Sequence, residues 1–435
     1  LKTHMEGMNQ LNTILFTNAH LNHEPGLCDL LVEDGRFLEI GPCLNKKYPI
    51  GNVCDLNGKL VLPPFVDSHI HLDYVYTARE PGADNCSGTL FEGIERWSHG
   101  KRNRSVEEIK RRARTALKKE ILNGTQYMRT HVDVTDPSLT GLKAILELRD
   151  ELKGVLDLQV IAFPQEGMYS YTNGHKLVEE ALIMGADVVG AIPHYEFTRE
   201  WGEKSIQTVV QLALKYDKLI DIHCDETDDE QSRFIESLAA LAYQNGIGSR
   251  TTASHACAMG SYNNAYVYKL FQLLERSGIN IISCPTENIH LQGRYDSYPK
   301  RRGLTRVKEL SGAGINVCFA QDSISDPWYP LGNGNLMTIL DFGLHICHLM
   351  SFPEIENSFC YITDNGARTL SMEGSYGIRP GNDADFIVLD APDAFEAIRE
   401  RVGVLASVRR GNFLFRKQPA KTTFNCGFLS RAEES

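Results

Sequence analysis

Eight short apolar segments recur between residues 69 and 323, and stretches of helix-forming residues separate them. Short β-branched runs that alternate with helical stretches are typical of parallel βα units. The predicted strand ends are HIH (69–71), QYMRTHVDV (126–134), LQVIAFPQEG (158–167), DVVGAIPHYEF (187–197), LIDIHCDE (219–226), TTASHA (251–256), INIISCPTEN (279–288) and INVCFAQDS (315–323). Eight units predict an α/β fold, a (β/α)8 TIM-type barrel, in which functional side chains gather at the carboxyl ends of the strands.

Both ends of the chain have a different pattern, in which short strand-like runs alternate with turn residues. The turn signals are Asp34-Gly35, Asn57-Gly58 and Gly411-Asn412. Pairs of this kind between apolar runs favour β-hairpins. We therefore expect residues 1–63 and 372–435 to form one small β-sandwich domain, and residues 64–371 to form the barrel. A barrel needs about 250 residues, which leaves room for this second domain in a chain of 435.

Charge and cysteine usage exclude several classes of protein. The formal net charge of −11 argues against nucleic-acid binding, because phosphates demand a basic face; a small neutral ligand fits better. The eleven cysteines include no Cys-x-x-Cys pair, which indicates buried, reduced thiols and a cytoplasmic location. The most apolar late stretch, residues 336–350, is too short and polar to span a bilayer, and LKTHMEGMNQ lacks the apolar region of a signal peptide.

His69-Ile70-His71 places two imidazoles one residue apart at the end of an apolar run. On a strand, successive side chains point to opposite faces, so the two histidines share one face while Ile70 packs behind them. Ligand-type residues end three further predicted strands, at His223, His255 and Asp322. Such residues at four strand ends on one face of a barrel predict a metal site.

This arrangement resembles the metal-dependent amidohydrolase superfamily, which has His-x-His after the first strand, histidines after the fifth and sixth, and an aspartate after the eighth. The β domain built from both termini and the segment GIRPGNDADFIVLD fit the same resemblance. Further segments are similar to those of bacterial-type cytosine deaminases, namely SGTLFEGIERW, RTHVDV, FPQEG, IPHYEFTRE, HCDETDDEQSRF, NIHLQGR, YPKRRGLTRVKEL and DPWYPLG. The resemblance therefore covers the whole predicted barrel.

The resemblance implies one divalent metal ion, held by His69, His71, His223 and Asp322. Three neutral imidazoles and a carboxylate suit Fe²⁺ or Zn²⁺ equally well. Such a metal lowers the pKa of bound water from 15.7 to about 7, so that hydroxide is available at neutral pH. The nucleophile is then water and not a side chain, and Cys224 is expected to be a packed neighbour of the site.

The resemblance also assigns three groups to proton transfer. Glu226 would deliver a proton to N3 of a pyrimidine ring while hydroxide attacks C4. His255 would orient the water and stabilise the developing negative charge. Asp322 would take the proton of the water and pass it to the departing ammonia. General acid–base help of this kind contributes about 10²- to 10⁴-fold to the rate.

Substrate recognition is expected from a polar group and two aromatic ones. Gln165 carries a donor and an acceptor on one amide, which can pair with N1–H and O2 of a pyrimidine. Phe163 and Trp328 would supply apolar walls for a flat ring. His131 and His194 are expected to support the ligands and the surrounding structure.

One position departs from the family pattern. Cytosine deaminases of this group have an aspartate directly after the metal-binding aspartate, near the C5 edge of the ring, and Ser323 stands there. Serine is smaller and uncharged, so the pocket is expected to accept a C5 methyl group, with a shift in preference of about 1 to 3 kcal/mol. Tyr74-Val75-Tyr76 and Thr286-Glu287 also differ from the pattern, at loop positions that can shape the pocket.

The leading hypothesis is hydrolytic deamination of cytosine, 5-methylcytosine or both, to uracil or thymine and ammonia, within pyrimidine salvage. Another cyclic amidine, such as isoguanine or creatinine, is the alternative substrate. A two-metal relative would need a lysine after the fourth strand, where Ile192-Pro193-His194 stands, and the Pro-Cys-x-x-Cys signature of zinc cytidine deaminases is absent from the sequence. A metal-free assembly subunit is disfavoured because the ligand positions and Glu226 are all filled. An oligomer of identical chains is implied by the resemblance.

Overall fold

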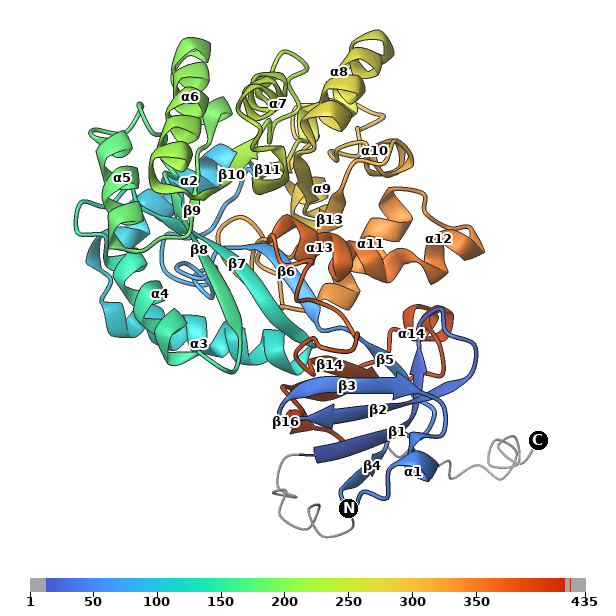
Figure 1. Ribbon diagram of the computed structural model, residues 1–435. Helices are drawn as coiled ribbons and strands as arrows, with labels where there is room; N and C mark the ends of the chain where they lie inside the picture. Colours follow the sequence, from blue (N-terminus) through green and yellow to red (C-terminus); the bar gives the residue numbers. More distant parts are fainter. Residues whose placement is uncertain (1–12, 419–422, 424–435) are drawn as a thin grey trace.

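The structure is a computed structural model that describes residues 13–418 and residue 423, and its larger part is a barrel of parallel strands (Figure 1). The barrel strands are β6 (Phe65–Ile70), β7 (Thr125–Asp133), β8 (Asp157–Phe163), β9 (Val188–Val189), β10 (Leu219–Cys224), β11 (Thr251–His255), β12 (Asn280–Ser283) and β13 (Val317–Phe319). They pair in sequence order from β6 to β13, and every neighbouring pair is parallel. All eight predicted strands are confirmed.

The barrel closes between β6 and β13 through one residue, Asp322. A parallel bridge joins Ile70 to Asp322. The Asp322 N–H donates to the carbonyl of His69 at 2.7 Å, and the His71 N–H donates to the carbonyl of Asp322 at 3.2 Å. The residue that the sequence predicts as a metal ligand therefore also joins the two edges of the sheet.

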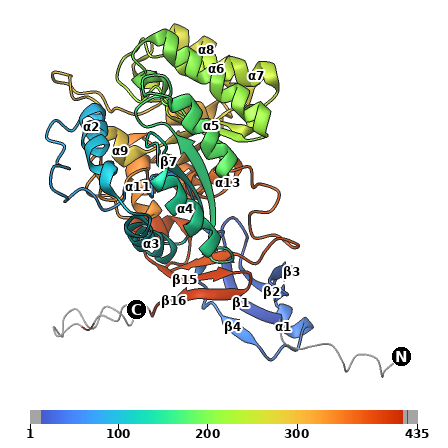
Figure 2. The same ribbon diagram turned by 90° about the vertical axis from the view of Figure 1, so that its left-hand side faces the viewer.

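Helices lie outside the strands in both views (Figures 1 and 2). They are α2 (Leu90–Gly100), α3 (Val106–Leu122), α4 (Thr140–Glu151), α5 (Gly174–Met184), α6 (Arg199–Tyr216), α7 (Phe234–Asn245), α8 (Asn264–Ser277), α9 (Pro285–Leu291), α10 (Val307–Gly312), α11 (Leu336–Ile346), α12 (Phe352–Glu356) and α13 (Asp364–Thr369). The local sequence explains their limits, as α3 illustrates. The Ser105 hydroxyl accepts from the Glu108 N–H at 3.2 Å, and Gly124 follows the helix with a φ of +101°, which favours glycine.

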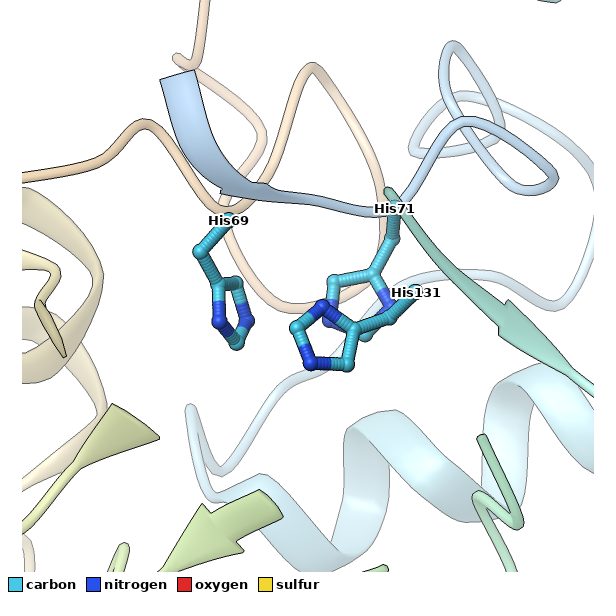
Figure 3. A group of neighbouring side chains, drawn as sticks. All are labelled: His69, His71 and His131. Carbon is cyan, nitrogen blue, oxygen red and sulfur yellow. The ribbon is translucent and has the colours of Figure 1, made fainter. Parts of the chain in front are cut away.

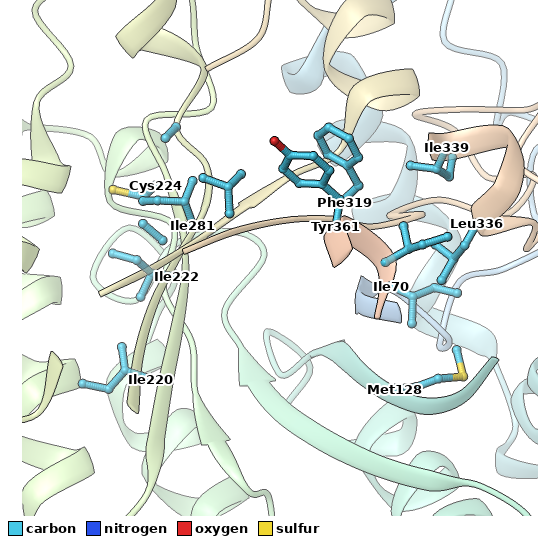
Figure 4. Packing of buried hydrophobic residues seen from close by; sticks show 14 of the residues in the cluster. Ile70, Met128, Ile220, Ile222, Cys224, Ile281, Phe319, Leu336, Ile339 and Tyr361 are labelled. Carbon is cyan, nitrogen blue, oxygen red and sulfur yellow. The ribbon is translucent and has the colours of Figure 1, made fainter. Parts of the chain in front are cut away.

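Successive side chains of a barrel strand point to opposite faces, so one set packs in the hydrophobic core and the other faces the barrel interior. Ile220, Ile222 and Cys224 of β10 belong to the hydrophobic cluster between strands and helices (Figure 4). Asp221 and His223 lie between them in the sequence, so their side chains point to the opposite face, the barrel interior. Cys224 is therefore a core residue, as predicted.

The second part of the molecule is a sheet with strands from both ends of the chain. Its strands are β1 (Thr13–Leu21), β2 (Leu27–Glu33), β3 (Arg36–Gly41), β4 (Val53–Asp55), β5 (Leu60–Leu62), β14 (Phe386–Leu389), β15 (Val404–Arg409) and β16 (Asn412–Arg416), with the short helices α1 (Leu44–Lys47) and α14 (Ala394–Arg399). The order is β16-β15-β14-β5-β1-β2-β3, and β4 branches from β1. Phe16 and Phe386 meet in its own core with ring centroids 4.9 Å apart. The predicted union of both termini is confirmed.

Two of the predicted turns differ from expectation. Asp34 and Gly35 join the antiparallel strands β2 and β3 as predicted. Asn57-Gly58 forms a turn with positive φ values of 55° and 69°, but β4 and β5 both pair in parallel with β1 and not with each other. The predicted hairpin is therefore wrong, because a turn residue fixes local direction and not the pairing partner. The last turn lies one residue earlier than predicted, at Arg410-Gly411.

Direct hydrogen bonds join the sheet to the barrel. The Gln126 amide at the start of β7 donates to the Ser407 hydroxyl and to the Val408 carbonyl, both at 2.9 Å. The Tyr127 hydroxyl donates to Asp385 at 2.6 Å. The predicted limits between the two parts, at residues 63/64 and 371/372, stay a prediction, and residues 1–12, 419–422 and 424–435 of the smaller part lie outside the described residues.

Two smaller expectations concern the membrane and the thiols. Among the described residues, no helix combines the length and the hydropathy that a bilayer span requires. Every cysteine in the described part of the chain has a free thiol, but Cys43 and Cys86 are exposed. The expectation of reduced thiols agrees with this part of the chain, while their general burial does not.

Candidate metal centre and active site

Three imidazoles and one carboxyl group converge at the carboxyl ends of the barrel strands. His69 and His71 come from the end of β6, His223 from β10, and Asp322 from the segment after β13. Nε2 of His71 lies 3.2 Å from Nε2 of His223. Oδ1 of Asp322 lies 3.6 Å from Nε2 of His69 and 3.5 Å from Nε2 of His71. The four side chains are buried and face a common point.

These four groups fit a single divalent cation. Tetrahedral ligands at about 2.0–2.1 Å from a metal lie about 3.4 Å from one another, close to the observed spacing of 3.2 to 3.6 Å. Nε2 of His69 has no hydrogen-bond partner among the described residues. Burial, and to a smaller extent the neighbouring imidazoles, lower the pKa of His69, His71 and His223 well below the ordinary value. The rings are therefore neutral and able to ligate.

Further potential ligands lie in the same cluster, among them His131 and Cys284. The ring of His131 is 4.0 Å from that of His69 and 5.0 Å from that of His71, and Figure 3 shows the three side chains together. Cys284 forms a similar group with His69 and Asp322. Burial and the nearby carboxyl groups raise the pKa of the Cys284 thiol well above its usual value. A protonated thiol is a weak ligand, which favours the imidazoles and the carboxylate.

A hydrogen-bonded chain orients the ring of His69. Nδ1 of His69 lies 2.9 Å from the Ser254 hydroxyl, which donates to Asp221 at 2.7 Å. Asp221 also accepts from the Arg129 guanidinium at 3.0 Å. Because the Ser254 proton is used on Asp221, the hydroxyl accepts from Nδ1–H of His69. This fixes the tautomer in which Nε2 is free to bind a cation.

Replacing Ser254 by alanine is expected to weaken metal binding by about 10- to 100-fold, because His69 loses the acceptor that fixes its tautomer. The metal dissociation constant, measured by competition with a chelator, tests this. Ser283→Ala is the matched control, since Ser283 is a buried serine on the neighbouring strand and its hydroxyl has no hydrogen-bond partner among the described residues. Equal metal affinity in the two variants would contradict the role of Ser254.

Glu226, His255 and Asp322 lie next to one another on the other side of the centre. Nδ1 of His255 is 3.5 Å from Oε1 of Glu226 and 3.8 Å from Oδ2 of Asp322. The Asn288 amide of α9 lies between Glu226 and His255, at 3.5 Å and 3.1 Å. Burial, and then the Asp322 carboxyl group, raise the pKa of Glu226 well above the ordinary value. Glu226 can therefore hold a proton near neutral pH.

A cavity adjoins these groups. Its apolar lining comes from Tyr74, Leu90, Leu291 and Trp328. Its polar lining includes Gln165, Glu226, Glu287 and Ser323. The cavity also reaches the metal centre, through His71, His223 and Asp322. The structure thus brings together every predicted site residue except His69, His255 and Phe163 around one space, and the two histidines stand directly behind it.

Phe163 lies elsewhere than expected. Its ring stacks on the ring of His223, with centroids 4.1 Å apart and an interplanar angle of 19°. It is fully buried and is not among the residues that line the cavity. Tyr74 and Trp328 do line the cavity, and their rings lie 4.7 Å apart.

Gln165 is held from two directions. The Tyr74 hydroxyl lies 3.5 Å from its Oε1. The next residue, Glu166, accepts from Lys101 at 2.5 Å, and Lys101 also donates to Asp133 at 2.8 Å. This partly buried ion pair fixes the segment after β8, so the Gln165 amide is presented to the cavity in a defined place.

The sequence interpretation did not single out the roles of several residues that the fold brings to the site. Tyr74 and Glu287 belong to segments noted only as different from the family pattern. Asn288 and Leu291 belong to the motif NIHLQGR, so the motif marks their position although not their direction. Ser254 pairs with His223 between the parallel strands β10 and β11, so its side chain lies on the same face as that histidine.

The chain is similar to known proteins over most of its length. Residues 52–415 match the amidohydrolase family. The chain is 50% identical to 5-methylcytosine deaminase from Klebsiella pneumoniae liganded with 5-fluorocytosine, with a TM-score of 0.92 over 94% of this chain and 99% of that chain. A structure of 5-methylcytosine deaminase from Klebsiella pneumoniae liganded with phosphonocytosine gives 51% identity and a TM-score of 0.91 over 94% and 100% of the two chains. N-isopropylammelide isopropyl amidohydrolase from Pseudomonas sp. (strain ADP) is 30% identical over 410 residues, 93% of this chain and 98% of that protein.

Proposed function

Because the chain belongs to the amidohydrolase family, we propose that it is a hydrolytic deaminase of cytosine-type bases, with 5-methylcytosine as its preferred substrate. One observation carries the proposal: over 94% of its length the chain is 50% and 51% identical to structures that are named 5-methylcytosine deaminase and hold 5-fluorocytosine and phosphonocytosine. The reaction consumes water, replaces the 4-amino group by oxygen, and releases ammonia with thymine or uracil.

His69, His71, His223 and Asp322 are the proposed ligands of one divalent metal ion, Fe²⁺ or Zn²⁺. The spacing of their donor atoms and their neutral, buried rings support this assignment. When bound, such an ion makes water acidic enough to supply hydroxide near neutral pH.

Three side chains are proposed to handle the protons. Glu226 delivers a proton to N3 of the ring as oxygen adds to C4, and its raised pKa supports this role. Asp322 takes the proton of the attacking water and returns it to the leaving amine. His255, held by Asn288 at 3.1 Å, orients the water and stabilises the charge that develops at C4.

The base is proposed to bind flat between aromatic side chains. Gln165 pairs with O2 and N1–H of the ring, because its amide offers both a donor and an acceptor. Trp328 and Tyr74 supply apolar walls, and both line the cavity. The Trp328 indole N–H donates to the Leu90 carbonyl at 3.2 Å, which satisfies its only polar group.

Ser323 is proposed to face C5 of the base, which explains a preference for a 5-methyl group. Replacing Ser323 by aspartate is expected to lower the ratio of 5-methylcytosine to cytosine turnover by about 10- to 200-fold, the range that one methyl group gives in a fitted pocket. Measured kcat/KM values for the two bases test this, and cytosine turnover is the internal control for folding. An unchanged ratio would place Ser323 away from C5.

The deciding experiment is ammonia release from the purified metal-loaded protein with cytosine, 5-methylcytosine, isoguanine, creatinine and N-isopropylammelide. We expect the highest kcat/KM with 5-methylcytosine. A higher kcat/KM with isoguanine or creatinine would show that the proposed substrate is wrong, although the reaction would still be a hydrolytic deamination. Isopropylamine release from N-isopropylammelide would assign the chain to the activity that its 30% identical relative is named for.

An oligomer of identical chains, a cytoplasmic location and a place in pyrimidine salvage complete the proposal. Small-molecule chemistry at a buried cavity supports the absence of nucleic-acid and membrane partners from this reaction. Light scattering combined with size-exclusion chromatography tests the assembly.

A further inference from the structure

One side of the cavity contains more buried carboxyl oxygens than the described residues satisfy. Glu287 and Asp326 are both buried, with exposed fractions of 1% and 0%. Glu287 and Ser323 line the same cavity, and Asp326 follows Ser323 by three residues in the sequence.

Among the described residues, no hydrogen-bond partner satisfies Oδ2 of Asp326 or Oε2 of Glu287, but of these two residues only Glu287 lines the cavity. Oδ1 of Asp326 accepts from the N–H groups of Trp328 and Tyr329, at 3.0 Å and 3.1 Å. Oε2 of Glu287 has no hydrogen-bond partner among the described residues. Glu287 lines the cavity, so this oxygen is available to a bound molecule.

Two hydrogen-bond donors that belong to nearby segments, the Tyr74 hydroxyl and the Gln321 amide, are used by other acceptors. The Tyr74 hydroxyl points to Oε1 of Gln165, at 3.5 Å. The Gln321 amide donates to the backbone carbonyl of Ser323 at 3.0 Å. A buried polar group without a partner is costly. A bound molecule that brings a polar group to Glu287 is therefore favoured over one that does not.

We infer that Glu287 selects bases by their C5 substituent, and that cytosines with a hydroxyl-bearing substituent, such as 5-hydroxymethylcytosine, form a further substrate class. The inference rests on the proposed function, which places C5 beside Ser323. A hydroxyl both donates and accepts, so it complements the Glu287 carboxyl group in either protonation state. A methyl group does neither.

The reaction with this class needs no additional reactant. Water adds to C4, the bond between C4 and N4 breaks, and ammonia leaves with the proton of the water. The product, 5-hydroxymethyluracil, keeps its C5 substituent, and nothing is oxidised or reduced. Glu287 is thus a specificity residue, which acts on the binding and orientation of the base.

The test measures kcat/KM of the metal-loaded protein for cytosine, 5-methylcytosine and 5-hydroxymethylcytosine. Wild-type protein is expected to use 5-hydroxymethylcytosine with a kcat/KM comparable to that for 5-methylcytosine. Glu287→Leu should lower the ratio of the two by about ten- to hundredfold, the value of one hydrogen bond to a charged or buried group. Glu287→Gln keeps a donor and an acceptor and should retain most of the ratio.

Thr286→Val is the matched control, since Thr286 is the buried neighbour of Glu287 on α9 and is not among the lining residues. Its ratio should equal that of the wild type. Wild-type protein that uses 5-methylcytosine but not 5-hydroxymethylcytosine overturns the inference, and so does an unchanged ratio in Glu287→Leu. If Glu287→Leu does not fold, the wild-type ratio of kcat/KM for 5-hydroxymethylcytosine to that for 5-methylcytosine is the test of the inference.

Absence of ammonia release from all three bases would count against the proposed function and not against Glu287. In that case the affinities for 5-hydroxymethyluracil and thymine are compared by calorimetry in wild type and Glu287→Leu. Tighter binding of 5-hydroxymethyluracil to the wild type supports the inference, and equal binding of the two bases overturns it.

Discussion

Replacing Glu226 by glutamine is expected to lower kcat for 5-methylcytosine by about 10²- to 10⁴-fold, the usual contribution of a general acid or base. Glu226 is 3% exposed and its raised pKa lets it hold the proton that N3 receives. Glutamine keeps the volume and a contact with Asn288 but has no acidic proton. Steady-state kinetics together with metal analysis of the same sample measure the effect.

Glu230→Gln is the matched control for this variant. Glu230 lies in the same acidic segment but is exposed, so its replacement should leave kcat unchanged. Full metal content in Glu226→Gln is also expected, because Glu226 is not a proposed ligand. Near-normal turnover in Glu226→Gln with a full complement of metal would remove Glu226 from the mechanism.

Removal of the metal is expected to abolish turnover and to lower the thermal stability of the protein. Free water has a pKa of 15.7, compared with about 7 for water on a catalytic metal, so hydroxide becomes scarce at neutral pH. A cation present at 1,000 times its dissociation constant contributes about 4 kcal/mol to the free energy of unfolding. Dialysis against a chelator, followed by an ammonia assay and thermal unfolding, tests both effects. Added Fe²⁺ or Zn²⁺ should restore both turnover and thermal stability.

A pair of histidine variants separates loss of the site from general damage. His71→Ala removes a ring whose Nε2 faces His223, and it should lose both metal and activity. His345→Ala removes a side chain that is 60% exposed on α11, and it should keep both. Protein that is free of metal and still fully active would rule out a metal-dependent reaction.

The barrel and the convergence of the candidate ligands could be predicted because their signals are local. An apolar run that ends in a polar residue marks a strand and the end of the barrel to which it points, as LIDIH does for β10. Alternation then places His69 and His71 on one face without further information. The acid Glu226 follows from its place directly after β10, within a specific motif.

Features that depend on packing between distant segments could not be predicted. Phe163 ends β8 much as His223 ends β10, but strand direction does not say which of two neighbouring rings stands in front of the other. Glu287 and Asn288 lie on α9, a helix of seven residues, and only its docking against the barrel decides which side chains reach the cavity. The Asn57-Gly58 turn is a further example. Its residues predict a turn, but β4 and β5 pair with β1 and not with each other.

The bridge between Ile70 and Asp322 has a consequence for how the chain matures. During synthesis His69 and His71 emerge about 250 residues before Asp322, so a growing chain holds only part of the proposed ligand set until the last strand has docked against the first. A chain that binds the cation tightly has therefore formed the bridge between Ile70 and Asp322 that closes the barrel. Metal content is thus a measure of correctly finished molecules as well as of active ones.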